Sequence, residues 1–288
     1  MESTTSLQLN PLAMFMRQPK IYIRLPSNGE YWPEKSFVPS ETGEYPVFSM
    51  TAQDEMLLKI PDALMSGQAV VDVIQHCMPN IKNAWDTPTI DLDVILIAIR
   101  LATYGETMRT PIKIGEIEME YVVDLRTVMD SLQSRIQWVP YIPVSNELTL
   151  FVRPVNYKQL SQAALQAFET QKIIQMSNND AMSEEDKIKI FKESFSKLTE
   201  LTIGTISASI YQIDSSNGST ENPEFIKEFI DNVDRDIFNK IQKHLETLKD
   251  NNSVKPVVVP VSEEMRENGI TGDTIEIPLT FDVSNFFA

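Results

Sequence analysis

The chain is poor in the residues on which most catalytic and metal sites depend. Its 288 residues include one cysteine, Cys77, and two histidines, His76 and His244. No disulfide can form within the chain, and a zinc site built from four Cys and His ligands is excluded. The nine glycines are dispersed, and no P-loop, dinucleotide fingerprint, nucleophile elbow or HExxH motif occurs. We therefore expect no cofactor, no metal site and no enzymatic activity.

Basic residues are also scarce, with 25 Lys and Arg against 41 Asp and Glu and a formal net charge of −16. Binding to nucleic acid or to an anionic membrane needs clustered Lys and Arg, so neither partner is expected. The N-terminal residues lack the pattern of a signal peptide, and the most apolar stretch, 94–102, is too short to span a bilayer. Since a lone thiol is typical of a reducing cytosol, we expect a soluble intracellular protein that works by contact.

The first half of the chain predicts both strands and helices. Residues 20–25 alternate as a strand does, and the turn residues Pro26, Ser27 and Gly29 end it. Thr51 is expected to cap a helix that Pro61 ends, and Ser66 to cap the next one. Further elements are expected at 92–104 (a central buried helix with Gly105 as its C-cap), about Gly115 (a β-hairpin), at 124–133 (a helix) and at 147–153 (a strand).

The second half is richer in helical patterns. Residues 156–177 form an amphipathic pattern, and Ser183 is expected to cap a helix with Ile188, Phe191, Phe195 and Leu198 on its apolar face. Residues 214–220 predict a mobile loop. Asn222 and Pro223 predict the start of one long helix to residue 249. Strands are expected at 257–259 and 274–281.

Together these elements predict an α+β fold, with mixed helices around a small β-sheet with a hairpin and a long helical insertion before the C-terminal strands. Residues 1–155 are expected to form the α/β body and residues 156–252 the helical region. Residues 253–288 hold the C-terminal strands, which are expected to return to the sheet of the body.

Three features allow both a structural and a functional interpretation. The apolar stripe of the 223–249 helix suits packing on the helix at 183–210 or an oligomer contact with another chain. Asp91 and Asp93 suit a helix first turn, or a cation site. His76 and Cys77 are neighbours on a helix and point about 100° apart, so Cys77 is expected in the core and not in a catalytic pair.

Aromatic residues supply the candidate partner-binding sites, namely Tyr31, Trp32, Phe281, Phe286 and Phe287. The C-terminal aromatics suit docking in the protein's own core or insertion into a partner groove. Adjacent residues of an extended strand point to opposite faces, so one ring of Phe286 and Phe287 is expected to face outward. Removal of residues 284–288 is then expected to impair assembly more than folding.

Three segments carry a resemblance to a known family. They are Pro11 to Trp32, then Asp54 to Leu64 continuing through Ile74–Cys77, Ile95–Arg100 and Tyr104–Gly105, and finally Ile277 to Phe287. Together they resemble the baseplate hub and hub-assembly proteins of T4-type contractile-tailed phages. The resemblance covers residues 11–153 and the last strand, and region 156–250 contributes little to it.

The resemblance implies a non-enzymatic role in tail assembly, as a central hub component or a hub-assembly chaperone, with other baseplate hub or tail proteins as partners. It implies a location in the host cytoplasm during assembly or in the virion tail baseplate. A stoichiometric structural subunit of the mature virion is the near alternative, and a hydrolase with an unrecognised site the distant one. Proteins of this kind often carry cysteine pairs at positions that here read 109–113 and 256–260 without cysteine. Apolar contacts and strand pairing are expected to replace a metal there.

Overall fold

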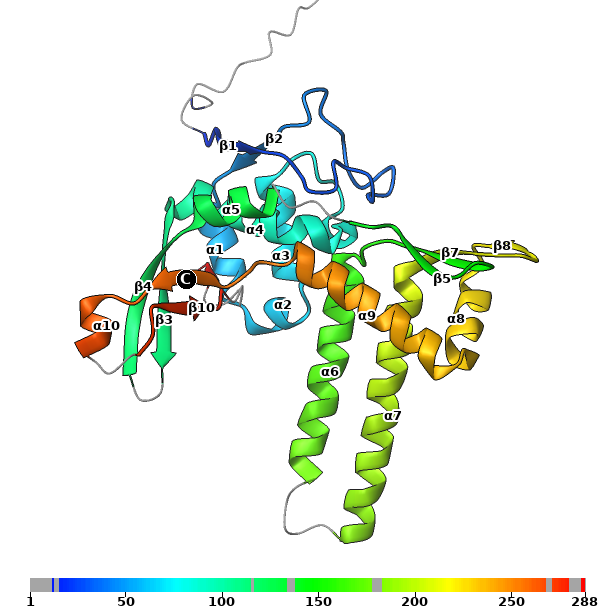
Figure 1. Ribbon diagram of the computed structural model, residues 1–288. Coiled ribbons are helices and arrows are strands. Elements are labelled where there is room, and N and C mark those ends of the chain that lie inside the picture. The colour runs from blue at the N-terminus through cyan, green and yellow to red at the C-terminus, as the bar shows by residue number, and fades with distance from the viewer. Residues whose placement is uncertain are drawn as a thin grey trace, which may run out of the picture.

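The computed structural model describes residues 12, 16–114, 117–133, 138–177, 183–267, 271–279 and 286–287. Helices and small antiparallel sheets are combined throughout these residues, and the predicted α+β class is confirmed (Figure 1). Phe281 lies outside the described residues. Within them, no helix is long and apolar enough to cross a membrane.

The N-terminal strand and its turn form as predicted. Strand β1 (Pro19–Ile23) pairs antiparallel with β2 (Tyr45–Phe48). After β1 the amide of Asn28 donates to the carbonyl of Leu25 at 2.9 Å. Asn28 and Gly29 both have positive φ, 51° and 84°, a conformation that Asn and Gly adopt at least cost. The turn carries the buried Ser27 back toward the helices.

The helices of the body surround one that is buried on nearly every side. This helix, α4 (Thr89–Tyr104), ends at Gly105 and forms the centre of the main hydrophobic core, as its uniformly apolar sequence predicted. A short 3-10 helix, Ala84–Asp86, precedes it. The other helices of the body are α1 (Ala52–Leu57), α2 (Pro61–Met65), α3 (Gln68–Cys77) and α5 (Leu125–Gln133).

Helix caps in this region agree with the sequence at one position and differ at another. Thr51 caps α1 in a reciprocal capping box with Asp54, as expected. Ser66, expected to cap α3, instead ends α2, and Gly67 with φ 80° is the N-cap. The reason is space and backbone conformation, because a Cβ at position 67 would lie 2.6 Å from Ser161 Oγ. Pro61 does not end α1 but occupies the first turn of α2, where its missing amide costs nothing.

Two hairpins lie at one end of the body. Strands β3 (Thr107–Ile114) and β4 (Ile117–Asp124) form the predicted hairpin. Strands β9 (Val257–Pro260) and β10 (Thr274–Ile277) pair with each other, with α10 (Glu263–Glu267) between them. The expectation that the last strands join an earlier sheet is wrong. Prolines at 256, 260 and 278 border these strands and remove amides that a wider sheet would need. Apolar contacts of Val259 and Ile277 with Tyr121 connect the two hairpins, without cysteine.

A second sheet joins segments that are far apart in the sequence. Its order is β5 (Tyr141–Ser145), β6 (Leu148–Val152), β7 (Ile210–Ser215) and β8 (Gly218–Thr220), all antiparallel. The mobile loop expected at 214–220 is instead the β7–β8 hairpin, in which Ser215 Oγ donates to the carbonyl of Gly218 at 2.9 Å. The region expected to be a helical insertion therefore supplies two strands to a sheet begun before it. The division into three domains stays a prediction.

The predicted long helix at 223–249 is two helices, α8 (Pro223–Asn232) and α9 (Arg235–Asn252). The helix is interrupted at Val233 because Asp234 acts as a new N-cap. Its side chain accepts hydrogen bonds from the amides of Asp236 and Ile237 at 3.0 Å. His244 lies in the middle of α9. Of the predicted stripe, Ile226, Ile230, Ile241 and Leu248 are buried in a second core against the four-stranded sheet. These four residues of the stripe pack inside the chain, and an oligomer contact through the rest of it stays a prediction.

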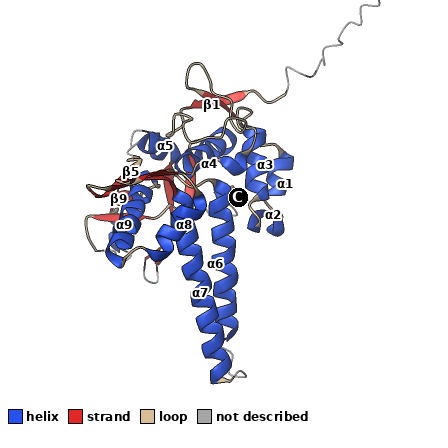
Figure 2. Cartoon of the chain, turned by 90° about the vertical axis from the view of Figure 1, so that its right-hand side faces the viewer, coloured by secondary structure: helices blue, strands red, loops and turns tan. Residues whose placement is uncertain are grey.

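The most prominent feature is an arm of two antiparallel helices, α6 (Tyr157–Ser177) and α7 (Glu184–Ser209). Figures 1 and 2 show the arm projecting away from the body in both views. Ser183 caps α7 as predicted, accepting from the amide of Asp186. At its base α7 passes directly into β7, and Ile206 and Ile210 anchor it in the second core.

Candidate protein-binding surfaces

Of the two aromatic residues near the N-terminus that were predicted to bind a partner, Tyr31 and Trp32, the second is buried in the core. Trp32 is buried, stacks on Phe37 with ring centroids 4.8 Å apart, and donates from Nε1 to Asp91 Oδ2 at 2.8 Å. Tyr31 is half-buried with its ring 6.1 Å from that of Trp138. A contact with a partner through this pair would therefore involve Tyr31 and not Trp32.

The partner of Trp32 is a fully buried carboxylate at the start of α4. Asp91 is 0% exposed and accepts from the Ser27 amide at 2.8 Å and the Ser27 hydroxyl at 2.5 Å, as well as from Trp32. Burial raises the pKa of Asp91 to about 6, against the opposing effect of these three donors. The sequence predicted a first-turn acid, which is correct. The structure adds that this acid holds the N-terminal turn onto the central helix.

The two C-terminal aromatics lie in the main core, so the expectation of an outward-facing ring is wrong. Phe286 is 2% exposed and Phe287 6% exposed, and their rings meet edge to face at 5.0 Å. Arg100 of α4 donates to the carbonyl of Phe286 and places its guanidinium 5.2 Å from the centre of that ring. The Tyr104 hydroxyl donates to the carbonyl of Phe287 at 3.0 Å. The described C-terminal residues thus complete the core at the end of α4.

His76, which a hydrolase could use as a base, lies in a polar cluster with Asp54 and Arg17. His76 Nδ1 lies 2.7 Å from the buried Asp54, and Arg17 reaches both the same carboxylate, at 3.8 Å, and the carbonyl of His76 at 2.6 Å. Burial alone would raise the pKa of Asp54, but hydrogen bonds from Thr51 and His76 outweigh it and lower that pKa. The cluster connects the segment before β1 to α1 and α3. Among the described residues, no group of three or more His, Cys, Asp or Glu could hold a metal ion.

Cys77 is not an activated nucleophile. Its side chain is buried among the apolar residues of α3, as expected. Burial and the nearby Asp54 raise the pKa of the thiol to about 12, whereas reactive cysteines have a lowered pKa.

We expect Cys77 to resist alkylation in the folded protein, because both its burial and its raised pKa keep the thiolate scarce. With iodoacetamide at pH 8, mass spectrometry should find labelling at least about 100-fold slower in the native protein than in guanidinium chloride. The denatured sample is the control for reagent activity. Equal rates in the two states would contradict the buried position of Cys77.

Several large hydrophobic side chains of the arm are exposed to solvent. Ile188, Phe191 and Phe195, which belong to the predicted apolar face of α7, are exposed, Phe191 by 58% and Phe195 by 65%. Phe168 of α6 is also 51% exposed. These four residues are called the aromatic face below. Large exposed apolar groups gathered on one element mark interaction sites more often than single scattered ones do.

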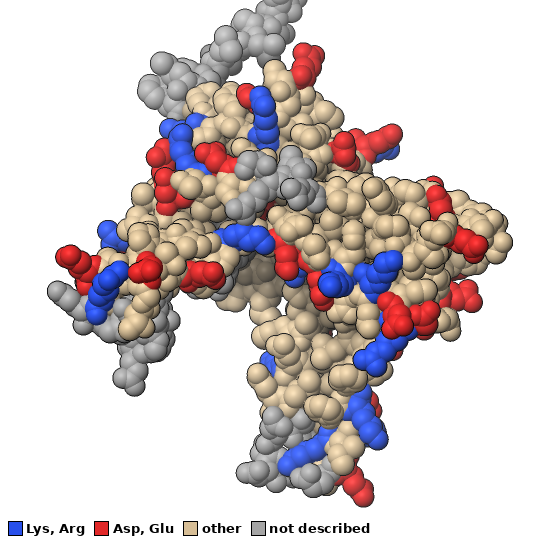
Figure 3. Space-filling view, viewed as in Figure 1, with Lys and Arg blue, Asp and Glu red and all other residues tan. Residues whose placement is uncertain are grey.

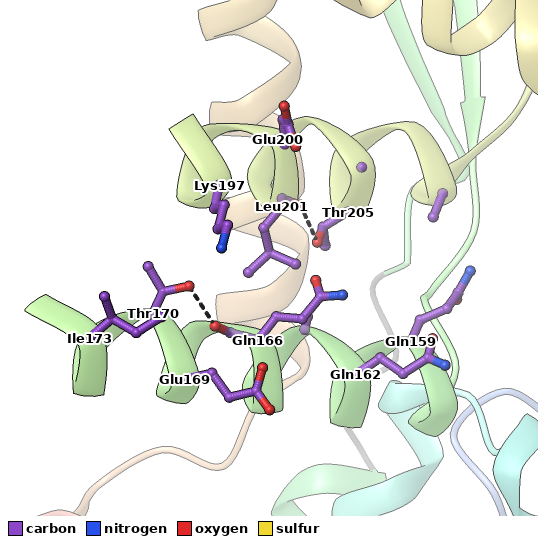
Figure 4. Close-up of a pocket in the computed structure, with 13 residues that line it drawn as sticks. Gln159, Gln162, Gln166, Glu169, Thr170, Ile173, Lys197, Glu200, Leu201 and Thr205 are labelled. Atoms are coloured by element: carbon purple, nitrogen blue, oxygen red, sulfur yellow. Dashed lines mark hydrogen bonds between the residues drawn. The ribbon is translucent and has the colours of Figure 1, made fainter. Parts of the chain in front are cut away.

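The space between the two helices of the arm forms a separate feature. A groove of about 550 Å³ runs between α6 and α7. Figure 4 shows Leu201 and Lys197 pointing from α7 toward α6, with Gln166 of α6 close to them. Polar and apolar residues both line the groove, and none of the four residues of the aromatic face is among them.

Comparison with known proteins places the chain in a family. Searches of curated proteins and of solved structures found no match. The family model described as T4 bacteriophage base plate protein matches residues 16–260. This range includes the N-terminal turn, the central helix α4 and the whole arm. The chain therefore belongs to the family of T4 bacteriophage base plate proteins.

Proposed function

We propose that this baseplate protein acts in tail morphogenesis as a component of the central hub or as a chaperone of hub assembly. It would work by protein–protein contacts with other baseplate or tail proteins, in the host cytoplasm during assembly or in the virion tail. The observation that carries the proposal is the aromatic face of the arm. A projecting element with Phe168, Phe191 and Phe195 exposed offers the rigid apolar anchors that dominate protein interfaces.

The chemistry of the described residues supports a binding role over a catalytic one. The thiol of Cys77 is buried with a raised pKa. His76 is hydrogen-bonded to Asp54, whose remaining contacts are with Thr51 and Arg17 and serve to join α1, α3 and the N-terminal segment. Nucleophilic catalysis needs a base directed at an activated nucleophile. His76 is instead bonded to Asp54, and the thiol of Cys77 is not activated. The net charge of −16 favours protein partners over nucleic acid.

The test is to inactivate the gene in a phage that encodes the protein, and to compare purified particles with lysates by quantitative mass spectrometry. A hub component would be found in the particle at a fixed ratio to the other baseplate proteins. A chaperone would be found in infected cells but not in particles, and baseplates would remain incomplete without it. Normal baseplates in the absence of the protein would overturn both forms of the proposal.

A further inference from the structure

Two Asn–Gly pairs lie within the described residues, and the structure places them in different surroundings. They are Asn28 with Gly29, in the turn after β1, and Asn217 with Gly218, in the β7–β8 hairpin. A third pair, at 268–269, lies outside the described residues. In such a pair the backbone nitrogen of the glycine can attack the side-chain amide of the asparagine, because glycine has no Cβ to hinder the approach. In a folded protein this approach requires that the backbone can open locally.

The backbone of the first pair is held in place. The amide of Gly29 donates to the hydroxyl of Ser27 at 3.0 Å. Ser27 is itself buried and bonded to Asp91 through its amide and its hydroxyl. A Cβ at position 29 would lie 3.1 Å from the ring of Phe37, so the turn has little room to shift. The nitrogen that would attack Asn28 is therefore engaged in a hydrogen bond within a tightly packed turn.

The second pair lies at an exposed end of the molecule. Every residue from 215 to 219 is exposed, and a Cβ at position 218 would meet nothing within 4 Å. Strand β8 is the last strand of its sheet, and three of its residues pair with β7. Figure 1 shows this hairpin reaching outward at the right-hand side of the view. Short, exposed terminal elements open at the lowest free-energy cost in a folded protein, so the two reacting atoms can meet here.

We propose that Asn217 is a site of spontaneous deamidation in the folded protein, and that Asn28 is protected from the same reaction. The Gly218 nitrogen attacks Cγ of Asn217 and forms a new C–N bond. The bond from Cγ to Nδ2 breaks, and ammonia leaves with the proton of the Gly218 amide. The product is a succinimide ring. Water is the co-reactant that opens this ring at either of its carbonyls, which gives aspartate or isoaspartate.

Both products change the hairpin. Each adds a carboxylate, which takes the formal net charge of the chain from −16 to −17. Asp214 lies in the same hairpin, where it accepts from Ser219 Oγ at 2.6 Å, and Figure 3 shows Asp and Glu side chains toward this end of the molecule. Isoaspartate also adds one carbon to the backbone, which displaces the pair of Ser215 and Gly218 that closes the hairpin. We therefore expect the modified β8 to separate from β7 while β5 and β6 stay paired.

Peptide mapping by mass spectrometry tests the site. The purified chain is kept folded in mildly alkaline buffer, where amide nitrogens lose their protons more readily, and is digested in acid so that digestion adds no reaction. Conversion at Asn217 should be at least about tenfold faster than at Asn28, because opening the buried turn breaks hydrogen bonds. In guanidinium chloride, where no turn protects either pair, the two rates should agree within about threefold. Equal rates in the folded protein would overturn the inference, and so would a folded protein unreactive at Asn217 whose denatured form reacts there.

Hydrogen exchange on the same aged samples tests the consequence. We expect the backbone amides of 213–220 to exchange at least about tenfold faster after conversion, with β5 and β6 unchanged. Asn217→Gln is the matched control, because glutamine keeps the amide at this exposed position but needs a larger ring to react. This variant should melt like the wild type and keep slow exchange at 213–220 after the same treatment. Converted protein in which these amides exchange as slowly as in fresh protein would contradict the loss of β7–β8 pairing.

Discussion

Replacing Phe286 and Phe287 together by alanine should lower the free energy of unfolding by about 6 kcal/mol. Each buried Phe→Ala change costs about 3 to 5 kcal/mol, and the two losses overlap because the rings touch. For a chain of this size about 1 kcal/mol corresponds to roughly 2 to 4 °C, so thermal melts should shift downward by about 15 °C. The loss falls on the main core, since Arg100 and Tyr104 of α4 both bond to the backbone of these residues.

Two controls accompany this experiment. Phe225→Ala changes an exposed ring of the same type and should leave the melt nearly unchanged. Tyr104→Phe removes only a hydroxyl that bonds to the Phe287 carbonyl and to Glu55, with an expected cost of about 1 kcal/mol. An unchanged melting temperature in the double alanine variant, with binding to hub proteins lost, would restore the expectation that these aromatics serve a partner.

Asp91→Ala should cost about 3 to 5 kcal/mol. The change leaves three buried donors without an acceptor: the amide and hydroxyl of Ser27 and the indole N–H of Trp32. Urea unfolding at pH 7 measures the loss. Asp91→Asn keeps the volume and one acceptor oxygen and should cost less. A loss under about 1 kcal/mol in the alanine variant would mean that the turn at Ser27 holds its place without this carboxylate.

The same carboxylate makes stability depend on pH. In the folded protein burial raises the pKa of Asp91 from its ordinary value of 3.8 to about 6, so the folded state binds this proton more tightly than the unfolded state does. The stabilisation of the folded state by this proton is fully present below pH 3.8 and is lost as the pH rises through 6. Asp93, with a pKa also raised to about 6 by burial, acts in the same direction. Asp54, whose pKa is lowered, contributes stability that is lost in acid.

Urea unfolding should therefore show the wild type more stable at pH 5 than at pH 7.5, by about 1.4 kcal/mol for each raised carboxyl. Asp91→Asn should reduce this difference, because it removes one of the two groups. Equal stability of the wild type at the two pH values would contradict the raised pKa values.

Local signals in the sequence predicted most element boundaries. Thr51, Gly105, Ser183 and Asn222 with Pro223 each end or begin a helix where expected, because a cap is decided by a few neighbouring residues. The misplaced cap at Ser66 and the unbroken helix at 223–249 show the limit of such signals. Gly67 is selected by the close approach of Ser161, 94 positions away, and Asp234 could equally well have been a solvated acid inside a helix.

Contacts between distant segments could not be predicted. Asp91 and Ser27 are 64 residues apart, and Arg100 meets Phe286 across 186 residues. Helical periodicity identified Ile188, Phe191 and Phe195 as one apolar face, but it cannot say whether anything covers that face. The resemblance to hub and hub-assembly proteins was carried by residues outside 156–250, so it indicated the family without drawing attention to the arm. The main candidate surface came from the exposure of side chains in the folded chain.

The direct passage from α7 to β7 has a mechanical consequence. Helix α7 ends at Ser209 and β7 begins at Ile210, so no linker separates this helix of the arm from the sheet. A sideways force on the tip acts through a lever of about 39 Å on the anchors Ile206 and Ile210. The most compliant point is Gly204, since glycine inside a helix weakens it by about 0.5 to 1 kcal/mol relative to alanine. Tilting of the arm must therefore strain the helix near Gly204 or shift β7 against β6, and the four-stranded sheet responds as a unit to load at the tip.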